Sequence, residues 1–265
     1  MINTKSVRRS ILNMAYAGSA VHIGCAFSIV EILCVLYNNF LRFPENDCEH
    51  ENRDFLILSK GHGVMAQYAC MRYLDWLSQD ELDVYFSNGS QLKGLSDSRV
   101  KGLEVTSGSL GHGLSVGVGM AFGASLSGSD QRSFVIVGDG EINEGAVWEA
   151  LLFASHHQLS NLVVIVDANG YQAMGKTAEV IELGSIESKF ESFGFDVRTV
   201  DGHSEVSLQK TIEQLLSLPA TKPKALIANT VKGKGVSFME NNNVWHYSRL
   251  NSETLEQALA EIDGV

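Results

Sequence analysis

Residues 133–170 read SFVIVGDGEINEGAVWEALLFASHHQLSNLVVIVDANG, and this stretch decides the fold. Two short β-branched runs, within 133–140 and 161–170, each end in Gly, Asp or Asn, and the segment between them has helical periodicity. The pattern predicts a βαβ unit with two parallel strands and a right-handed crossover. A later strand is expected within KALIANTVKGKG, residues 224–235, which ends in a glycine-rich loop. We therefore expect an α/β fold with a mainly parallel sheet and helices on both faces.

Helical patterns cover much of the remaining chain. They span about 5–16, 28–41 and 63–76, and Ser28 followed by Glu31 indicates a capping box at the start of a buried helix. The first third of the chain is therefore expected to be rich in helix.

Glycines recur through the helical pattern of 109–128, each costing about 1 kcal/mol in a helix interior, which indicates close packing against another backbone. Their GxGxxxG spacing follows no β-rich segment and so does not match the dinucleotide-binding fingerprint. Residues 89–104 are polar and contain glycine, and we expect a loop there that covers part of the molecule. The tail, 251–265, has a short amphipathic pattern. No repeat or linker interrupts the chain, so 1–265 is expected to be a single domain.

Composition excludes several classes of protein. The formal net charge of −11 opposes binding to nucleic acid or to an anionic membrane surface. The longest apolar stretch, 29–36, is far shorter than the roughly 20 residues of a membrane span, and no signal-peptide plan is present, so a cytoplasmic protein is expected. The cysteines follow no zinc or disulfide spacing, and Cys34 and Cys70 are expected in the core.

Asp139 and Asn169 each follow the end of a predicted strand. Ligands of open parallel sheets bind beyond the carboxyl ends of the strands, and neighbouring strands lie about 4.8 Å apart, so the two side chains can reach one point. With a backbone carbonyl of the 169–171 turn they would supply half of the oxygen shell of Mg²⁺ and leave positions for a diphosphate. The alternative is that both residues form Asx turns after strands. Close backbone approach is allowed by Gly138, Gly140 and Gly170.

The GDG motif with Asn169 one helix and one strand further on resembles the metal–diphosphate motif of thiamine diphosphate enzymes. The wording GDGEINEG is similar to the transketolase branch of these enzymes, and further motifs agree in order: VHIG, LSKGHG, EVTSGSLGHG and TVKGKGVSFMENNNVWH. The resemblance runs from about residue 5 to the end of the sequence. It implies the diphosphate-domain fold, with thiamine diphosphate and Mg²⁺ or another divalent cation as cofactors.

The resemblance covers only one of the two cofactor-binding domains of a transketolase. In that family a following pyrimidine-binding domain supplies the glutamate that activates the cofactor and much of the acceptor-phosphate site. The chain therefore resembles the N-terminal subunit of a split transketolase, which is active only with a separate C-terminal subunit. The expected assembly is α2β2, because the family's cofactor lies between domains of different copies.

The resemblance also implies roles for individual residues. Asp139, Asn169 and the carbonyl of Tyr171 would hold the metal. His22, His62 and His246 would serve catalysis, since ketol transfer moves protons among hydroxyls near neutral pH, where imidazole titrates. Contacts to the cofactor are expected from these three histidines, Gly108, Leu110, Gly138, Asp139, Gly140, Glu141, Asn169 and Tyr171. The adjacent His156 and His157 are expected to be ordinary surface residues.

Glu144 and Glu149 have two interpretations. A carboxylate at a helix start is stabilised by the helix dipole by about 0.3–1 kcal/mol, which alone would explain Glu144. The resemblance instead places both residues in an interface between two copies of the domain, in a carboxylate and water network that links two active sites. We include both with the catalytic residues.

One position departs from the family. Relatives read GGHP where this chain reads KGLS, residues 93–96, so Leu95 stands in place of a histidine that hydrogen-bonds the donor sugar. A buried sugar hydroxyl facing leucine would lose about 1–3 kcal/mol. The donor or its placement is therefore expected to differ from the sugar phosphates of central metabolism, unless Lys93 or Ser96 compensates.

The predicted function is thiamine diphosphate-dependent transfer of a two-carbon ketol unit from a ketose or ketose phosphate to an aldehyde. The alternative is a non-catalytic cofactor-binding or regulatory subunit, which Leu95 favours and the complete histidine set opposes. A nucleotide-dependent oxidoreductase is disfavoured by the missing fingerprint.

Overall fold

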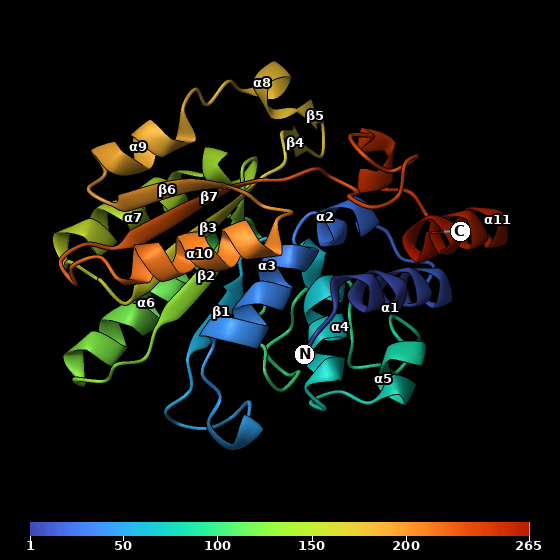
Figure 1. Cartoon of the computed structure of the whole chain (residues 1–265), viewed down its shortest axis with the longest axis horizontal. Helices are drawn as coiled ribbons and strands as arrows, with labels where there is room; N and C mark the ends of the chain where they lie inside the picture. Colours follow the sequence, from blue (N-terminus) through green and yellow to red (C-terminus); the bar gives the residue numbers. More distant parts are fainter. Residues whose placement is uncertain (265) are drawn as a thin grey trace.

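The computed structural model describes residues 1–264 and is built around one parallel sheet (Figure 1). The predicted βαβ unit is present, because β2 and β3 pair side by side in parallel and α7, Gly145–His156, connects them. The α/β fold expected from the sequence is thereby confirmed. In sheet order the strands are β1 (Phe55–Leu58), β2 (Ser133–Gly138), β3 (Leu162–Ala168), β7 (Lys224–Asn229) and β6 (Asp196–Asp201).

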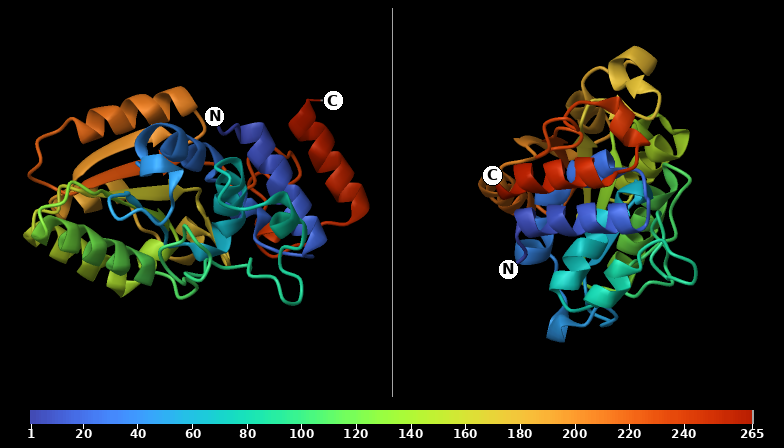
Figure 2. Two further views of the ribbon diagram at one scale, coloured as in Figure 1. Left: turned by 90° about the horizontal axis from the view of Figure 1, so that it is seen from below. Right: turned by 90° about the vertical axis from the view of Figure 1, so that its right-hand side faces the viewer.

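Helices cover both faces of this sheet, as Figure 2 shows for α10 and α6 on opposite sides. Side chains alternate along each strand, so Phe134 and Ile136 enter one apolar layer while Val135 and Val137 enter the other. The first layer is covered by α1 (Thr4–Ala17), α3 (Val30–Val35), α4 (Val64–Tyr73) and α10 (Glu205–Leu216). The second is covered by α6 (His112–Leu126), α7 and α9 (Ile186–Ser192).

Shorter elements complete the structure at the edges of these layers. A small hairpin follows β3, and a long loop without helix or strand runs from 84 to 111. The loop expected at 89–104 is therefore confirmed. The remaining elements are α2 (Ile23–Phe27), the π-helical η1 (Leu36–Phe40), the 3-10 turns η2 (Pro44–Asn46), η3 (Gly61–Gly63), η4 (Glu141–Asn143) and η5 (Asn243–His246), α5 (Gln79–Asp83), the hairpin β4 (Tyr171–Gln172) and β5 (Gly175–Lys176), α8 (Thr177–Val180) and α11 (Ser252–Asp263).

The two ends of the chain lie together. Helices α1 and α11 run side by side (Figure 2), and Asp263 accepts a hydrogen bond from Arg9 and forms an ion pair of 3.3 Å with Lys5. Further along, the backbone N–H of His22 donates to the carbonyl of His246 at 3.2 Å. This packing joins two histidine-bearing segments from opposite ends of the sequence.

The predicted capping box at Ser28 and Glu31 is wrong. Helix α3 begins after Ile29 without a side-chain cap, although the 28–41 segment is helical and buried as expected. Ser28 Oγ instead donates to Asp167, and Glu31 binds Arg8. Long-range buried polar partners outcompete the local cap, because leaving a buried charge unpaired would cost more than a cap contributes.

Helix α6 only partly follows the close packing expected from its glycines. A Cβ at Gly117 would lie 2.3 Å from Val135 Cγ2, and one at Gly113 would lie 2.6 Å from Ser59 Cα. In contrast, Gly119 and Gly123 face open space. The helix therefore packs tightly on the sheet with one side and presents a second small-residue side to the exterior.

The structure also tests two expectations drawn from composition, the burial of the cysteines and the lack of a membrane-spanning segment. All four cysteines are buried and free, and Cys34 and Cys70 lie fully in the core as expected. Within residues 1–264, none of the helices combines the length and the apolar character that crossing a membrane requires.

The two sides of α6 give matched substitutions. We expect Gly117→Ala to lower the free energy of unfolding by about 1–3 kcal/mol, because the methyl group collides with a fully buried strand residue. Gly123→Ala should raise it by about 0.5–1 kcal/mol, since alanine favours the helix and meets open space. Urea unfolding of both variants measures the difference, and equal effects at the two positions would contradict this packing.

Candidate functional site

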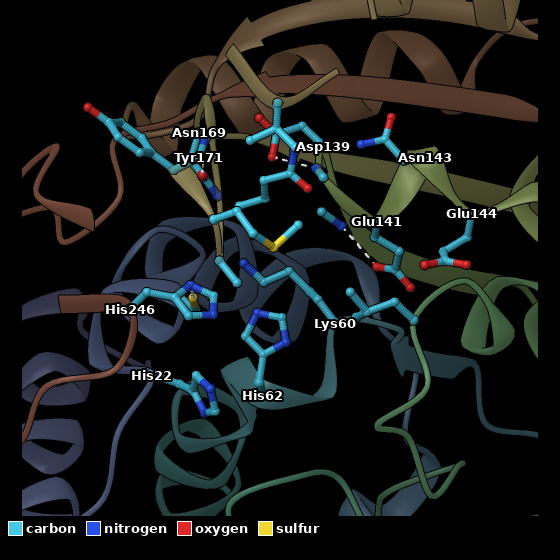
Figure 3. Close-up of a pocket in the computed structure, with 18 of the residues that line it drawn as sticks. His22, Lys60, His62, Asp139, Glu141, Asn143, Glu144, Asn169, Tyr171 and His246 are labelled. Atoms are coloured by element: carbon cyan, nitrogen blue, oxygen red, sulfur yellow. Dashed lines mark hydrogen bonds between the residues drawn. The ribbon is translucent and has the colours of Figure 1, made fainter. Parts of the chain in front are cut away.

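A cavity of about 430 Å³ opens at the carboxyl ends of β2 and β3. Figure 3 shows His22, His62 and His246 on one side, and Asp139 and Asn169 on the other. The further predicted residues that line it are Gly108, Leu110, Gly138, Gly140, Glu141, Glu144 and Tyr171, and Leu95 lines it as well. Of the predicted site residues, only Glu149 does not line this cavity.

Asp139 and Asn169 meet as the strand order predicts. Asp139 Oδ2 accepts from the backbone N–H of Gly170 at 2.7 Å, which ties the loops after β2 and β3 together. Asn169 Oδ1 accepts from the N–H of Tyr171 at 3.0 Å, so the Asx-turn alternative is also correct for this residue. A carbonyl oxygen has two lone pairs, so this turn leaves Asn169 able to bind a ligand.

Asp167, two residues before Asn169, anchors the surrounding groups. Its carboxylate accepts from Asn169 Nδ2 at 2.7 Å and Ser28 Oγ at 2.8 Å, and from Lys60 and Thr230. Because Nδ2 is held by Asp167, the oxygen of Asn169 is the atom left to face a cation.

The two buried aspartates have opposite pKa shifts. Desolvation and the charge of Asp167 raise the pKa of Asp139 to about 7, whereas Lys60 and three hydroxyl or amide donors hold the pKa of Asp167 below its usual range despite burial. A bound cation would remove the penalty at Asp139, so the residues fit a divalent metal. No cluster of three or more His, Cys, Asp or Glu side chains that could hold a metal occurs within 1–264, so a cation held here would also need amide, backbone or ligand oxygens.

Three histidines form one cluster although they are distant in sequence. The centroid of the His22 ring lies 5.2 Å from that of His62 and 5.3 Å from that of His246. His22 adopts a left-handed backbone conformation, with φ of 69°, at the start of α2. This conformation is uncommon for a residue with a side chain and occurs at functional sites, where the surrounding structure enforces it.

The electrostatics of the cluster favour neutral imidazoles. Burial first, and then the charges of Lys232, His22 and Lys60, lower the pKa of His246 to about 3. Burial and Lys232 lower the pKa of His22, and burial and Lys60 lower that of His62. At neutral pH each ring therefore carries one N–H and one lone pair.

Glu141 lines the cavity but its carboxylate is already engaged. It accepts from the N–H groups of Gly111 at 2.8 Å and Gly138 at 3.0 Å, and from Ser59 Oγ. Its position therefore fixes the loop that carries Gly108 and Leu110 against β2. The direct cofactor contact that the resemblance implies for Glu141 stays a prediction.

Glycines bring backbone segments close around the cavity. A Cβ at Gly61 would lie 1.9 Å from Ser107 Oγ, so the SKGHG turn packs directly on the 107–111 loop. A Cβ at Gly140 would lie 2.7 Å from Gln172 Cβ, which holds the hairpin after β3 against the GDG turn. Larger residues at either position would push the loops of the cavity apart.

Glu144 and Glu149 are both exposed, and Glu144 also lines the cavity. Glu144 is the N-cap residue of α7, yet its side chain makes no capping hydrogen bond. Its place at the helix start agrees with the helix-dipole interpretation, which requires no hydrogen bond. His156 and His157 are exposed as expected.

Four polar residues of the site were missed by the sequence analysis. Lys60 and Asp167 lie within the quoted SKGHG and VDANG segments, and both are almost completely buried. A charged residue inside a predicted strand, as Asp167 is, was a usable signal. Cys25 and Lys232 surround His246, at 3.4 and 2.9 Å from its Nδ1, and only their nearness to other motifs marks them.

Comparison with known proteins shows which family this chain resembles. Residues 4–262 match the family model described as "Transketolase, thiamine diphosphate binding domain". An apulose-4-phosphate transketolase subunit from Phocaeicola vulgatus is 36% identical over 98% of this chain and 92% of its own length. A 6-deoxy-6-sulfo-D-fructose transketolase subunit from a Clostridium species is 35% identical over 91% of this chain and 88% of its own length.

Solved transketolases share the fold. The enzyme from Campylobacter jejuni superposes with a TM-score of 0.89 at 27% identity, covering 98% of this chain and 42% of that chain. The enzyme from Leishmania mexicana gives 0.88 at 27% identity, with 99% and 42% covered. The chain thus spans about two-fifths of the length of these solved relatives.

The two aspartates should respond oppositely to neutralisation in metal-free buffer. Because the pKa of Asp139 is raised, its ionised form destabilises the folded chain fully above pH 7. Asp139→Asn should therefore raise the free energy of unfolding by about 1–3 kcal/mol at pH 8, and the gain should shrink as pH falls towards 4. Urea unfolding at several pH values, with a chelator present, measures it.

Asp167→Asn is the matched control for that experiment. It leaves Lys60 buried without a counter-charge, so stability should fall by about 3–5 kcal/mol at pH 8. A loss of stability in Asp139→Asn at pH 8 would show that Asp139 is not under electrostatic strain.

Proposed function

This chain belongs to the transketolase family, as its thiamine diphosphate-binding domain, and from this premise we propose how its own residues take part in ketol transfer. The single observation that carries the proposal is the arrangement of the cavity. Asp139 and Asn169 converge at the ends of two neighbouring strands, opposite three neutral histidines. One edge thus suits a metal-bound diphosphate and the other suits proton handling.

The metal edge consists of Asp139, Asn169 and the backbone carbonyl of Tyr171. These oxygens would hold Mg²⁺, which in turn neutralises a diphosphate group. Lys60, whose ammonium is buried beside Asp167, adds positive charge to the same edge. The glycines of the GDG turn keep the backbone close to this point without steric conflict.

The reacting edge consists of His22, His62 and His246. When bound, thiamine diphosphate supplies the nucleophilic carbon that takes up the two-carbon unit. The neutral imidazoles can donate to, or accept protons from, the hydroxyls of donor and acceptor, because each carries one N–H and one lone pair. Their lowered pKa values keep them in this form throughout the neutral range.

A partner polypeptide is part of the proposal. The relatives from Phocaeicola and Clostridium are both named as subunits, and the cavity is open beside exposed apolar residues, among them Met174 and Ile181. We propose that a C-terminal subunit covers this rim and completes the site. A second copy of this chain would cover the exposed side of α6 and α7, where Gly119 and Gly123 lie open, which gives an α2β2 assembly.

Leu95 supports a donor that differs from common sugar phosphates. Its side chain lines the cavity, and a Cβ at Gly108 would lie 3.1 Å from Leu95 Cδ1. Neither Lys93 nor Ser96 is among the described residues that line the cavity, so the structure lends no support to compensation by either. The two relatives are named for two different sugars, so neither name assigns the donor of this chain.

Reconstitution tests the proposed activity. The chain, mixed with its partner subunit, thiamine diphosphate and Mg²⁺, should transfer a ketol unit to an aldehyde acceptor, measured as formation of the new sugar. Asp139→Ala should reduce transfer at least 100-fold at fixed cofactor, because the metal loses its carboxylate. Cofactor binding without any transfer, over a panel of ketose donors, would favour the alternative of a non-catalytic subunit.

Substitution of Leu95 tests donor selectivity. With xylulose 5-phosphate and ribose 5-phosphate, wild-type kcat/KM should be low, and Leu95→His should raise it about 5- to 100-fold, since a buried hydroxyl regains a partner worth about 1–3 kcal/mol. Leu95→Met keeps the apolar character and should change nothing. Ordinary wild-type efficiency with this pair of sugars would end the case for an altered donor.

A further inference from the structure

Lys232 is a buried lysine that the proposed function leaves unexplained. It lies in the loop after β7, is 1% exposed, and does not line the cavity itself. Its Nζ lies 3.0 Å from Asn243 Oδ1 and 2.9 Å from His246 Nδ1. It also lies 5.7 Å from the centroid of the Tyr171 ring. The ammonium is therefore enclosed by η5 and the β4–β5 hairpin.

The directions of these hydrogen bonds follow from one fixed acceptor. The carbonyl of Ala173 can only accept, and it lies 3.1 Å from the amide nitrogen of Asn243. The amide oxygen of Asn243 must then face Lys232, which has to donate to it. As an ammonium, Lys232 has no lone pair, so it also donates to His246 Nδ1. That ring nitrogen consequently carries no proton.

We propose that Lys232 is a positioning residue that fixes His246 in the tautomer with the proton on Nε2. His246 Nε2 makes no hydrogen bond within residues 1–264, and the ring lines the cavity, so its N–H is free for a bound molecule. The same ammonium contributes to the lowered pKa of His246. His246 is thereby a preset hydrogen-bond donor instead of a mixture of two tautomers.

A second buried network holds the Lys232 loop in place. His203 Nε2 accepts from the N–H of Val231 at 2.7 Å, and the other ring nitrogen of His203 lies 2.9 Å from Glu31. Arg8 donates to the carbonyl of Lys234 at 2.9 Å and pairs with the same Glu31 at 2.7 Å. Glu31 thus connects two clamps, one on each side of Lys232.

Contacts from α2 restrict the loop further. The N–H of Gly233 donates to the carbonyl of Gly24 at 3.1 Å, and a Cβ at Gly24 would lie 3.3 Å from Lys232 Cγ. The loop is therefore fixed against the same helix that begins at His22. This arrangement keeps Lys232 within reach of His246 without any contribution from a ligand.

Nitrogen NMR of the histidine rings tests the tautomer directly. In long-range ¹H–¹⁵N spectra of the full chain at pH 7.5, His246 should show a protonated Nε2 and an unprotonated Nδ1, with the signals assigned by their loss in His246→Gln. Lys232→Met should abolish this single-tautomer pattern, and Lys232→Arg, which keeps a donor, should restore it. A proton on Nδ1 in the wild type would overturn the proposal.

Two control variants separate positioning from general damage. Lys224 is also almost fully buried, but its Nζ donates only to backbone carbonyls, of Ser160 at 3.0 Å and Lys222 at 3.4 Å. Lys224→Met should leave the His246 pattern unchanged, and a loss there would overturn the specific role of Lys232. Cys25 Sγ lies 3.4 Å from the same Nδ1. Cys25→Ala should have no effect, and persistence of the pattern in Lys232→Met would assign the role to Cys25 instead.

This inference rests on the proposed function only where it assigns a use to the Nε2 proton of His246. The NMR experiment needs neither cofactor nor substrate. A correct tautomer without ketol transfer would therefore count against the proposed function alone, and ketol transfer with the opposite tautomer would count against this inference alone.

Discussion

The candidate site depends on one buried ion pair, between Lys60 and Asp167. Both side chains are almost inaccessible to solvent, and the pair joins the loop after β1 to the end of β3. Ser28 and Thr230 donate to the same carboxylate, so four segments far apart in the sequence converge on it. A buried pair seldom adds net stability, since desolvation offsets the attraction. What this pair determines is geometry, because it holds Asn169 in the orientation that presents oxygen.

The site also shows why net charge alone is a poor guide to small ligands. The chain carries −11 overall, yet two buried lysines, Lys60 and Lys232, lie around the cavity beside the buried Asp139 and Asp167. At short range in a medium of low dielectric constant these local charges outweigh the distant surface carboxylates, which salt screens. A protein of negative net charge can therefore still present buried cations to an anionic diphosphate.

Sequence patterns predicted those parts of the structure that depend on interactions between residues close together in the sequence. The strand ends before Asp139 and Asn169 followed from the β-branched runs and the Gly, Asp and Asn residues that end them. The pairing of β2 with β3 followed from the helix between them. Strand β1, with four residues, is too short for such a signal, and β6, where only Val197 and Val200 are apolar, is too polar. Residues such as Ser28 and Glu31 were misinterpreted because their partners lie far away in the sequence. No pattern within a window of a few residues contains that information.

The two edges of the cavity are held by different parts of the molecule. Asp139 and Asn169 lie on the carboxyl ends of central strands, whose hydrogen-bonded register fixes their separation. The histidine edge instead depends on segments from both ends of the chain, since His22 and His246 are joined by a backbone hydrogen bond and by the packing of α1 against α11. A rigid sheet edge suits a metal and diphosphate, which demand constant geometry. A cluster assembled from loops needs additional restraints, which the Glu31 network and Lys232 supply. The imidazoles then keep one orientation and one protonation state beside the reacting atoms.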